Sequence, residues 1–156
     1  MNRRDQIKMT EAEIDEFVHG RRTMNVATIG KDGRPHLVAM WYGFLEGAPA
    51  FETYAKSQKV LNLKRDPRIT CLIEAGDAYE ELRGVELVGT ADVIEDEAPL
   101  LEVARSVVAR YHGLEGPDAE LAAAALARKR VAVVINVEKV VSWDHSKLGG
   151  ERPGGL

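Results

Sequence analysis

The residues best suited to chemistry lie in one short run, Tyr54-Ala55-Lys56-Ser57-Gln58-Lys59, which we call the cradle segment. A strand that ends at Tyr54 would deliver Lys56, Ser57 and Lys59 to the first turn of a helix. Free backbone N–H groups and the helix dipole favour an anion there, and ammonium and hydroxyl groups would add charge-assisted hydrogen bonds. In a simpler interpretation, Ser57 is only a helix N-cap and the lysines are solvated surface charges. The run therefore predicts either a phosphate site or an ordinary helix start.

The elements before this segment are predicted to form a helix and three strands. Thr10 and Glu13 have the spacing of a capping box, which indicates a helix that ends at Gly20. Residues 24–29, 36–45 and 50–54 have the composition of strands, and an Asp-Gly pair between the first two favours a tight hairpin turn. We expect these three strands to form an antiparallel meander.

The remaining sequence continues the same mixture of strands and helices. Ser57 is expected to cap a helix that ends near Asp66-Pro67, because the residue before proline resists helical geometry. Gly84 and Gly89 are expected to bend a long strand. The further expected elements are strands 68–74, 82–94 and 131–141 and helices 97–111 and 118–127. Six strands with a few helices predict an α+β fold, a curled antiparallel sheet or barrel with helices packed outside.

Length and composition are those of one ordinary domain. The chain has 156 residues, of which we expect 1–150 to form a single domain and 151–156 a loose tail. A net charge of −4 argues against nucleic acid as a partner, because its binders normally carry a basic surplus. We expect no contact with a membrane and a cytoplasmic location, since neither an apolar span nor a signal peptide is visible. The single Cys71 stands in an apolar strand pattern and is expected to be a core residue.

Familiar catalytic motifs are missing from the sequence. There is no Gly-x-Gly-x-x-Gly, no phosphate-loop lysine and no Gly-x-Ser-x-Gly. The four histidines, His19, His36, His112 and His145, do not have the spacing of metal ligands, so we expect no metal site. A bound cofactor would therefore have to supply any demanding chemistry.

Several short motifs together resemble one family, the pyridoxamine 5'-phosphate oxidase-like split-barrel flavoproteins, in the branch that uses the deazaflavin coenzyme F-420. The motifs are residues 26–29, 32–36, 40–42 and 54–59, then Asn62-Leu63, Asp66-Pro67-Arg68, and the closing stretches 130–133 and 141–144. The resemblance implies a six-stranded split β-barrel that works as a homodimer, with the cofactor at the subunit interface.

Three departures from the family pattern bear on the cofactor. The pyridoxamine-phosphate oxidases proper carry an arginine and a lysine for the phosphate of flavin mononucleotide (FMN), where this chain has Val38 and Gly43. Their arginine-and-histidine signature for the vitamin B6 phosphate is replaced by Ser142-Trp143-Asp144-His145. The resemblance therefore favours F-420 as cofactor, with FMN as the alternative.

The resemblance implies an oxidoreductase that transfers hydride between F-420 and an unsaturated small organic substrate. The implied cofactor-binding residues are Val38, Ala39, Met40, Thr53, Tyr54, Lys56, Ser57, Gln58 and Lys59. Trp41, Tyr79 and Trp143 are candidates for the substrate-facing wall, although core or interface packing explains them as well. The resemblance identifies no catalytic residue. His36 and His145 are candidate proton donors, although a structural role explains them as well. Arg65 and Arg68 are candidate partners of the acidic tail of F-420, although a solvated helix end explains them equally well. An FMN flavoprotein and a non-catalytic F-420 binder or carrier are the alternative functions.

Overall fold

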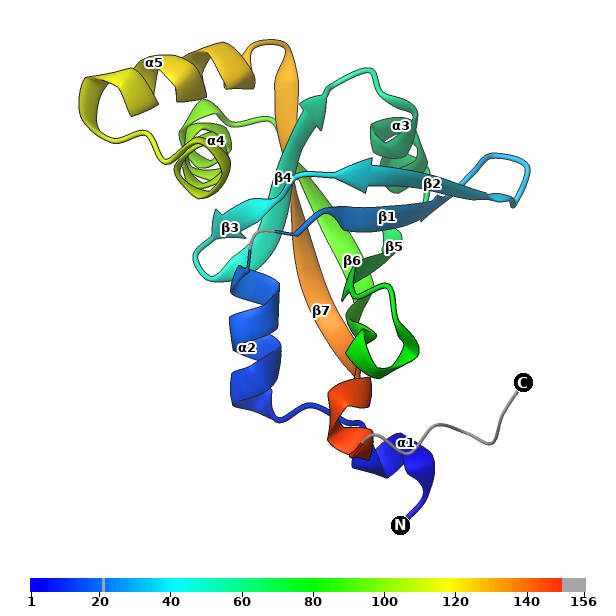
Figure 1. Ribbon diagram of the computed structural model, residues 1–156. Coiled ribbons are helices and arrows are strands. Elements are labelled where there is room, and N and C mark those ends of the chain that lie inside the picture. Colours follow the sequence, from blue (N-terminus) through cyan, green and yellow to red (C-terminus); the bar gives the residue numbers. More distant parts are fainter. Residues whose placement is uncertain (21, 150–156) are drawn as a thin grey trace.

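A strongly curled antiparallel sheet forms the body of the molecule in the computed structural model, which describes residues 1–20 and 22–149 (Figure 1). Its order is β2-β1-β5-β6-β7-β4-β3. The strands are β1 Met24–Ile29, β2 Pro35–Met40, β3 Gly43–Leu45, β4 Ala48–Tyr54, β5 Arg68–Ala75, β6 Arg83–Ile94 and β7 Arg130–Asp144. The expected fold class is thus confirmed, with seven strands instead of six. The tail predicted at 151–156 lies outside the described residues.

The additional strand arises because the expected strand 36–45 is broken at Trp41-Tyr42. Tyr42 is fully buried, and its hydroxyl donates to the carbonyl oxygens of Val18 and Gly20. Arg110 also donates to the Tyr42 carbonyl, at 3.0 Å. These contacts turn the chain away from β1, so β2 and β3 lie at opposite edges of the sheet. The predicted three-strand meander is therefore wrong: β2 pairs with β1, whereas β4 pairs with β3 and β7.

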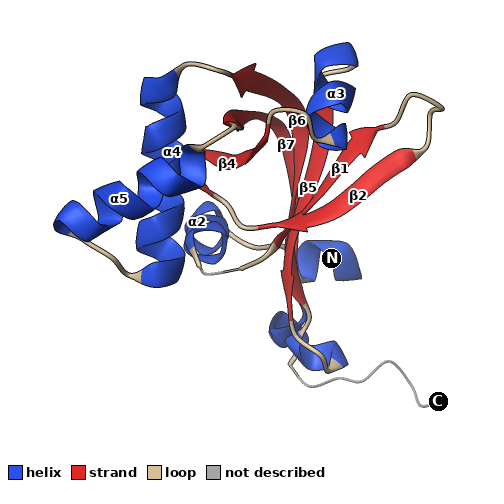
Figure 2. Ribbon diagram, turned by 90° about the horizontal axis from the view of Figure 1, so that it is seen from above, coloured by secondary structure: helices blue, strands red, loops and turns tan. Residues whose placement is uncertain are grey.

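The helices lie around the sheet, with α3 apart from α4 and α5 (Figure 2). They are α1 Arg3–Gln6, α2 Glu11–His19, α3 Gln58–Arg65, α4 Glu97–His112 and α5 Gly116–Ala127, and the short 3-10 helices are η1 Tyr79–Glu81 and η2 His145–Leu148. Thr10 and Glu13 form the predicted capping box. Helix α5 begins at Gly116, two residues earlier than the expected start at 118, because Pro117 fits its first turn. Among the described residues, no helix is long and apolar enough to cross a membrane.

A small apolar cluster of Ala104, Val108 and Ala123 packs α4 against α5. Two larger apolar clusters hold the other elements together. The larger one includes Met24, Phe51 and Ile73, all fully buried, and packs α2 against the strands. Cys71 belongs to this cluster as expected, and burial raises the pKa of its thiol to about 12, which leaves it unreactive. The second cluster joins β4 and β7 to α4 through residues such as Val103. The first half of β7 is thus covered on both faces.

Strands β6 and β7 form a long ribbon that bends at the predicted glycines. The pairing shifts between Val88 and Gly89, and a Cβ atom on Gly89 would lie 1.9 Å from the Asn136 carbonyl oxygen. Gly84 pairs with Trp143, whose indole would lie 2.2 Å from a Cβ at position 84. Both positions therefore need glycine because another group occupies the space of a side chain.

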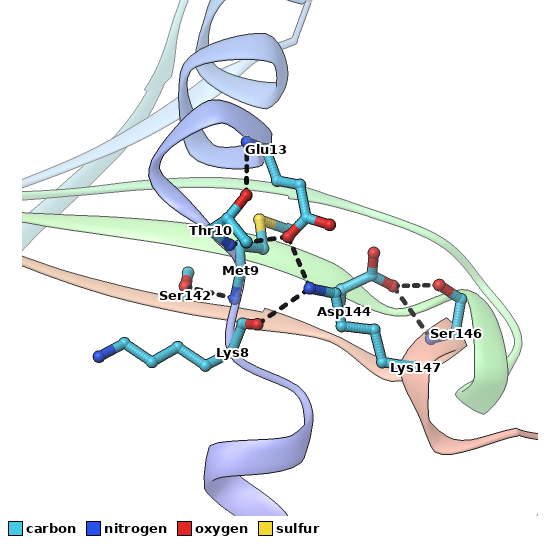
Figure 3. Close-up of polar contacts among 8 residues, drawn as sticks. All are labelled: Lys8, Met9, Thr10, Glu13, Ser142, Asp144, Ser146 and Lys147. Atoms are coloured by element: carbon cyan, nitrogen blue, oxygen red, sulfur yellow. Dashed lines mark hydrogen bonds and ion pairs between the residues drawn. The ribbon is translucent and has the colours of Figure 1, made fainter.

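The N-terminal segment is fastened to the far end of this ribbon (Figure 3). The Met9 N–H donates to Ser142 Oγ at 3.1 Å, and the Asp144 N–H donates to the Ile7 carbonyl at 2.7 Å. Lys147 Nζ reaches both Glu13, at 2.6 Å, and the Lys8 carbonyl oxygen. These bonds hold α2 in register with the end of β7.

Candidate anion-binding site

The cradle segment connects β4 to α3, as the sequence predicts. The Ser57 N–H closes a turn by donating to the Tyr54 carbonyl at 3.0 Å. The Ala55 N–H donates to the Lys129 carbonyl at 3.0 Å, which ties the segment to the residue before β7. Thr53 is buried at the end of β4, while Tyr54 and Lys56 are exposed. The helix start therefore lies beside the start of β7.

Ser57 occupies the N-cap position of α3 but does not cap it. Its backbone has the extended conformation of an N-cap residue, yet its side chain makes no capping hydrogen bond. The Oγ atom is buried and has no partner in the described structure. The expectation that Ser57 caps the helix through its side chain is thus wrong. A buried hydroxyl without a partner is costly, which makes this oxygen available to a ligand.

Most of Lys59 is buried. Its side chain is 9% exposed, and no hydrogen bond or ion pair joins it to another of the described residues. Burial lowers the pKa of its ammonium group, and the charge of Arg130 lowers it further, while Glu52 opposes both effects. The surface-charge interpretation fails for Lys59, although it fits the exposed Lys56.

A part-buried ion pair, which sequence reasoning missed, lies next to Lys59. Arg130 Nη1 donates to Glu52 Oε1 at 3.0 Å, and the guanidinium lies 4.3 Å from the centre of the Tyr54 ring. Glu52 is 5% exposed, its other oxygen has no partner in the described structure, and burial raises its pKa. Two features of the sequence could have indicated this ion pair. Glu52 is a single carboxylate inside an apolar strand, and Arg130 stands directly before another apolar strand.

The inner face of α3 is fixed by Asn62, which is fully buried. Gln58 Nε2 donates to Asn62 Oδ1 at 2.8 Å, and Asn62 Nδ2 donates to Thr28 Oγ1 at 3.0 Å. Arg65 donates to Asn62 and to the Ile29 carbonyl. Gln58 and Arg65 therefore position the helix on β1.

Arg68 also has a partner within the chain. It donates to both carboxylate oxygens of Asp66, at 2.7 and 3.0 Å, and these bonds lower the pKa of Asp66 to about 2. Arg68, like Arg65, would have to leave its present contacts in order to reach the acidic tail of F-420.

Strand β2 presents a free backbone edge. It is the outermost strand and pairs with β1 alone among the described strands. Val38 and Met40 pack against the core, and Ala39 is exposed on the opposite face. The unpaired edge of residues 38–40 can therefore offer N–H and carbonyl groups to a ligand.

The missing basic residue at position 43 has a packing explanation. A Cβ atom on Gly43 would lie 2.6 Å from Ser106 Oγ of α4, and the same hydroxyl accepts a hydrogen bond from the Phe44 N–H at 2.9 Å. No lysine fits here without moving α4.

The three aromatic residues of the expected substrate wall have different neighbours. Trp41 stacks on Tyr111 of α4, with ring centres 4.5 Å apart. The Tyr79 ring lies 4.6 Å from that of His145, whose Nδ1 is 2.8 Å from the Tyr79 carbonyl oxygen. Trp143 lies over Gly84. Among the described residues, no ring contact joins any two of these three side chains.

No group of acidic, histidine and cysteine side chains suited to a metal ion occurs in residues 1–20 and 22–149. Four of the surface cavities there have volumes of 340 to 500 Å³, and Lys56, Ser57 and Lys59 line none of these four. Tyr54, Lys56 and Gln58 are exposed, so one side of the cradle segment is open to a ligand or another chain.

Comparisons with known proteins agree with this fold. A structure of the conserved hypothetical protein Rv2991 from Mycobacterium tuberculosis is 44% identical, with a TM-score of 0.91, covering 100% of this chain and 98% of the other. An F420 reductase is 24% identical, with a TM-score of 0.62, covering 81% of this chain and 94% of the other. The heme storage protein HutZ from Vibrio cholerae is 17% identical, with a TM-score of 0.67, covering 86% and 96%. These last two likenesses show the fold alone. No curated protein matches the sequence.

The family model that matches the chain is that of pyridoxamine 5'-phosphate oxidase, over residues 10–144. This range includes all seven strands and the cradle segment. The chain therefore belongs to the pyridoxamine 5'-phosphate oxidase family of split-barrel proteins.

Proposed function

We propose that this protein is an oxidoreductase that uses F-420 to exchange hydride with an unsaturated small organic substrate. One observation carries the proposal: Lys59 and the Ser57 hydroxyl are buried at the start of α3 without partners among the described residues. Leaving such groups unpaired costs folding free energy, and an anion placed between them would recover it.

The chain's own residues fit a phosphorylated cofactor. Lys59, Ser57 and the free N–H groups of the first turn of α3 would hold its phosphate, with Lys56 nearby on the surface. The free edge of β2 at residues 38–40 would orient the ring through backbone groups. When bound, the deazaflavin ring supplies the carbon that gives or accepts hydride. The protein positions the substrate beside it and excludes water, which accounts for much of the rate gain in such reactions.

Two observations support F-420 over FMN. Val38 packs into the core, and Gly43 lies against Ser106, so neither position offers a second cation to a phosphate. FMN is the second candidate because the family as a whole is named for an FMN-type oxidase.

We further propose that the active form is a homodimer with the cofactor between the subunits. Large apolar side chains are exposed on the strands, and Leu37 of the edge strand β2 is 68% exposed. Val137 and Val140 of β7 are each 39% exposed. A second copy would cover such residues, and it would close the open side of the cradle.

Titration of the protein with F-420 and with FMN, followed by fluorescence, tests the cofactor. We expect F-420 to bind more tightly, and binding of neither would refute the proposal. Steady-state oxidation of reduced F-420 with a panel of enones and quinones then tests catalysis. Affinity without turnover would show a carrier instead of an enzyme. The molar mass of the protein, measured by light scattering after size-exclusion chromatography with and without F-420, tests for the dimer.

A further inference from the structure

The part-buried pair of Glu52 and Arg130 bears on which phosphate the cradle segment accepts. Both residues lie at neighbouring strand ends, because Glu52 pairs with Ala132 and Tyr54 pairs with Arg130 in the register of β4 and β7. The Ala55 N–H bond to Lys129 fastens the cradle segment to the same place. The pair is therefore part of the wall of the cradle.

The charges of this wall do not balance. Lys59 and Arg130 contribute two positive charges, and Glu52 contributes one negative charge, so one positive charge remains. Arg130 gives Glu52 its only ion pair in the described structure, through Oε1, and Oε2 is buried without a partner. The charges of Arg130 and Glu52 both act on the pKa of Lys59, although Lys59 forms no ion pair with Glu52. The exposed Lys56 adds less, since solvent screens its charge.

The candidate cofactors differ in the charge of their phosphate. A phosphomonoester such as that of FMN carries about 1.5 to 2 negative charges near pH 7. A phosphodiester, as in the side chain of F-420, carries one. A single net positive charge in a partly buried site matches a diester, whereas a monoester would bring a second negative charge close to Glu52.

We infer that Glu52 is a specificity-determining residue, which neutralises one of the two cations, Lys59 and Arg130, and so makes the cradle segment selective for phosphodiesters over phosphomonoesters. This inference rests on the proposed function. Glu52 acts by repelling the wrong ligand and by holding Arg130, not by contact with the reacting atoms.

A matched pair of ligands isolates the effect. FMN and riboflavin 5'-methylphosphate, its methyl diester, share one ring and differ by one charge. Glu52→Gln keeps the shape of the side chain and an oxygen that can accept the hydrogen bond from Arg130, but removes the charge. Because the loss of one negative charge acts about twice as strongly on a dianion as on a monoanion, we expect the affinity for FMN relative to its methyl ester to rise about tenfold or more. Glu74→Gln, at an exposed position at the opposite end of β5 from α3, should leave the ratio unchanged.

A second variant separates charge from a merely structural role. The double variant Glu52→Gln/Arg130→Gln again leaves one positive charge, that of Lys59, so the affinity ratio should return to that of the wild type. An unchanged ratio in Glu52→Gln, or no return in the double variant, overturns the inference. Both results are read only after wild-type protein has bound F-420 or FMN, so failure of the proposed function is seen separately, as absence of binding in the wild type.

Discussion

Substitution of Lys59 by methionine is the most direct test of the buried cradle. Methionine keeps an unbranched apolar side chain of similar length and removes the ammonium group. If that group donates a charge-assisted hydrogen bond to the cofactor phosphate, its loss should cost about 1.5 to 3 kcal/mol of binding free energy. The dissociation constant for F-420, measured by fluorescence titration, should then rise by about 10-fold to 150-fold.

Although Lys59→Met should weaken F-420 binding, it should not weaken the fold. Burial lowers the pKa of Lys59 in the folded protein, so the unfolded chain binds the proton more tightly. Between the folded pKa and the unfolded value near 10.5, stability of the wild type therefore rises with pH. Below the folded pKa the penalty for the buried charge is fully present. Lys59→Met removes this penalty. At neutral pH and without ligand, the variant should therefore be at least as stable as the wild type in urea denaturation. This advantage should shrink as pH approaches 10.5.

The exposed Lys64 on the same helix provides the control. It forms a surface ion pair with Glu95 at 3.0 Å, with half of its side chain exposed, and such pairs contribute little. Lys64→Met should change neither F-420 affinity nor stability by more than about 1 kcal/mol. If Lys59→Met binds F-420 as well as the wild type does, the assignment of Lys59 to the cofactor site is refuted.

Three further predictions concern how the fold positions the site. Thr10→Ala should lower the free energy of unfolding by about 1 kcal/mol, because the Thr10 side chain caps α2. Ser57→Ala should not lower it, because the Ser57 side chain makes no capping hydrogen bond. Equal losses for the two variants in urea denaturation would contradict the finding that the Ser57 hydroxyl has no partner. Gly43→Ala should destabilise the protein by about 1 to 3 kcal/mol because its methyl group meets Ser106 of α4, and an unchanged melting temperature would show that this contact yields freely. Tyr42→Phe should cost about 1 to 3 kcal/mol, since the buried Val18 carbonyl loses its donor while the Gly20 carbonyl keeps that of Arg110, and a neutral result would mean that water replaces the hydroxyl.

The sequence by itself determined most of the local structure. The capping box of α2, the Asp-Gly hairpin and the connection from β4 to α3 all depend on residues close together in the chain. The motifs of the cradle segment are equally local. For these features, neighbouring residues set the backbone conformation, so composition and spacing suffice to predict them.

Only the tertiary structure decided where strands end and which charges are buried. The strand 36–45 looks continuous in sequence, and it breaks because Tyr42 is held by α2 and by Arg110, which is 68 residues away. Glu52 and Arg130 are separated by 78 residues and meet only because β4 pairs with β7. That pairing also changes the interpretation of the cradle segment, whose lysines look alike in sequence. Packing buries Lys59 beside an ion pair and leaves Lys56 in solvent, because burial is a property of the assembled sheet and helices and not of the local sequence.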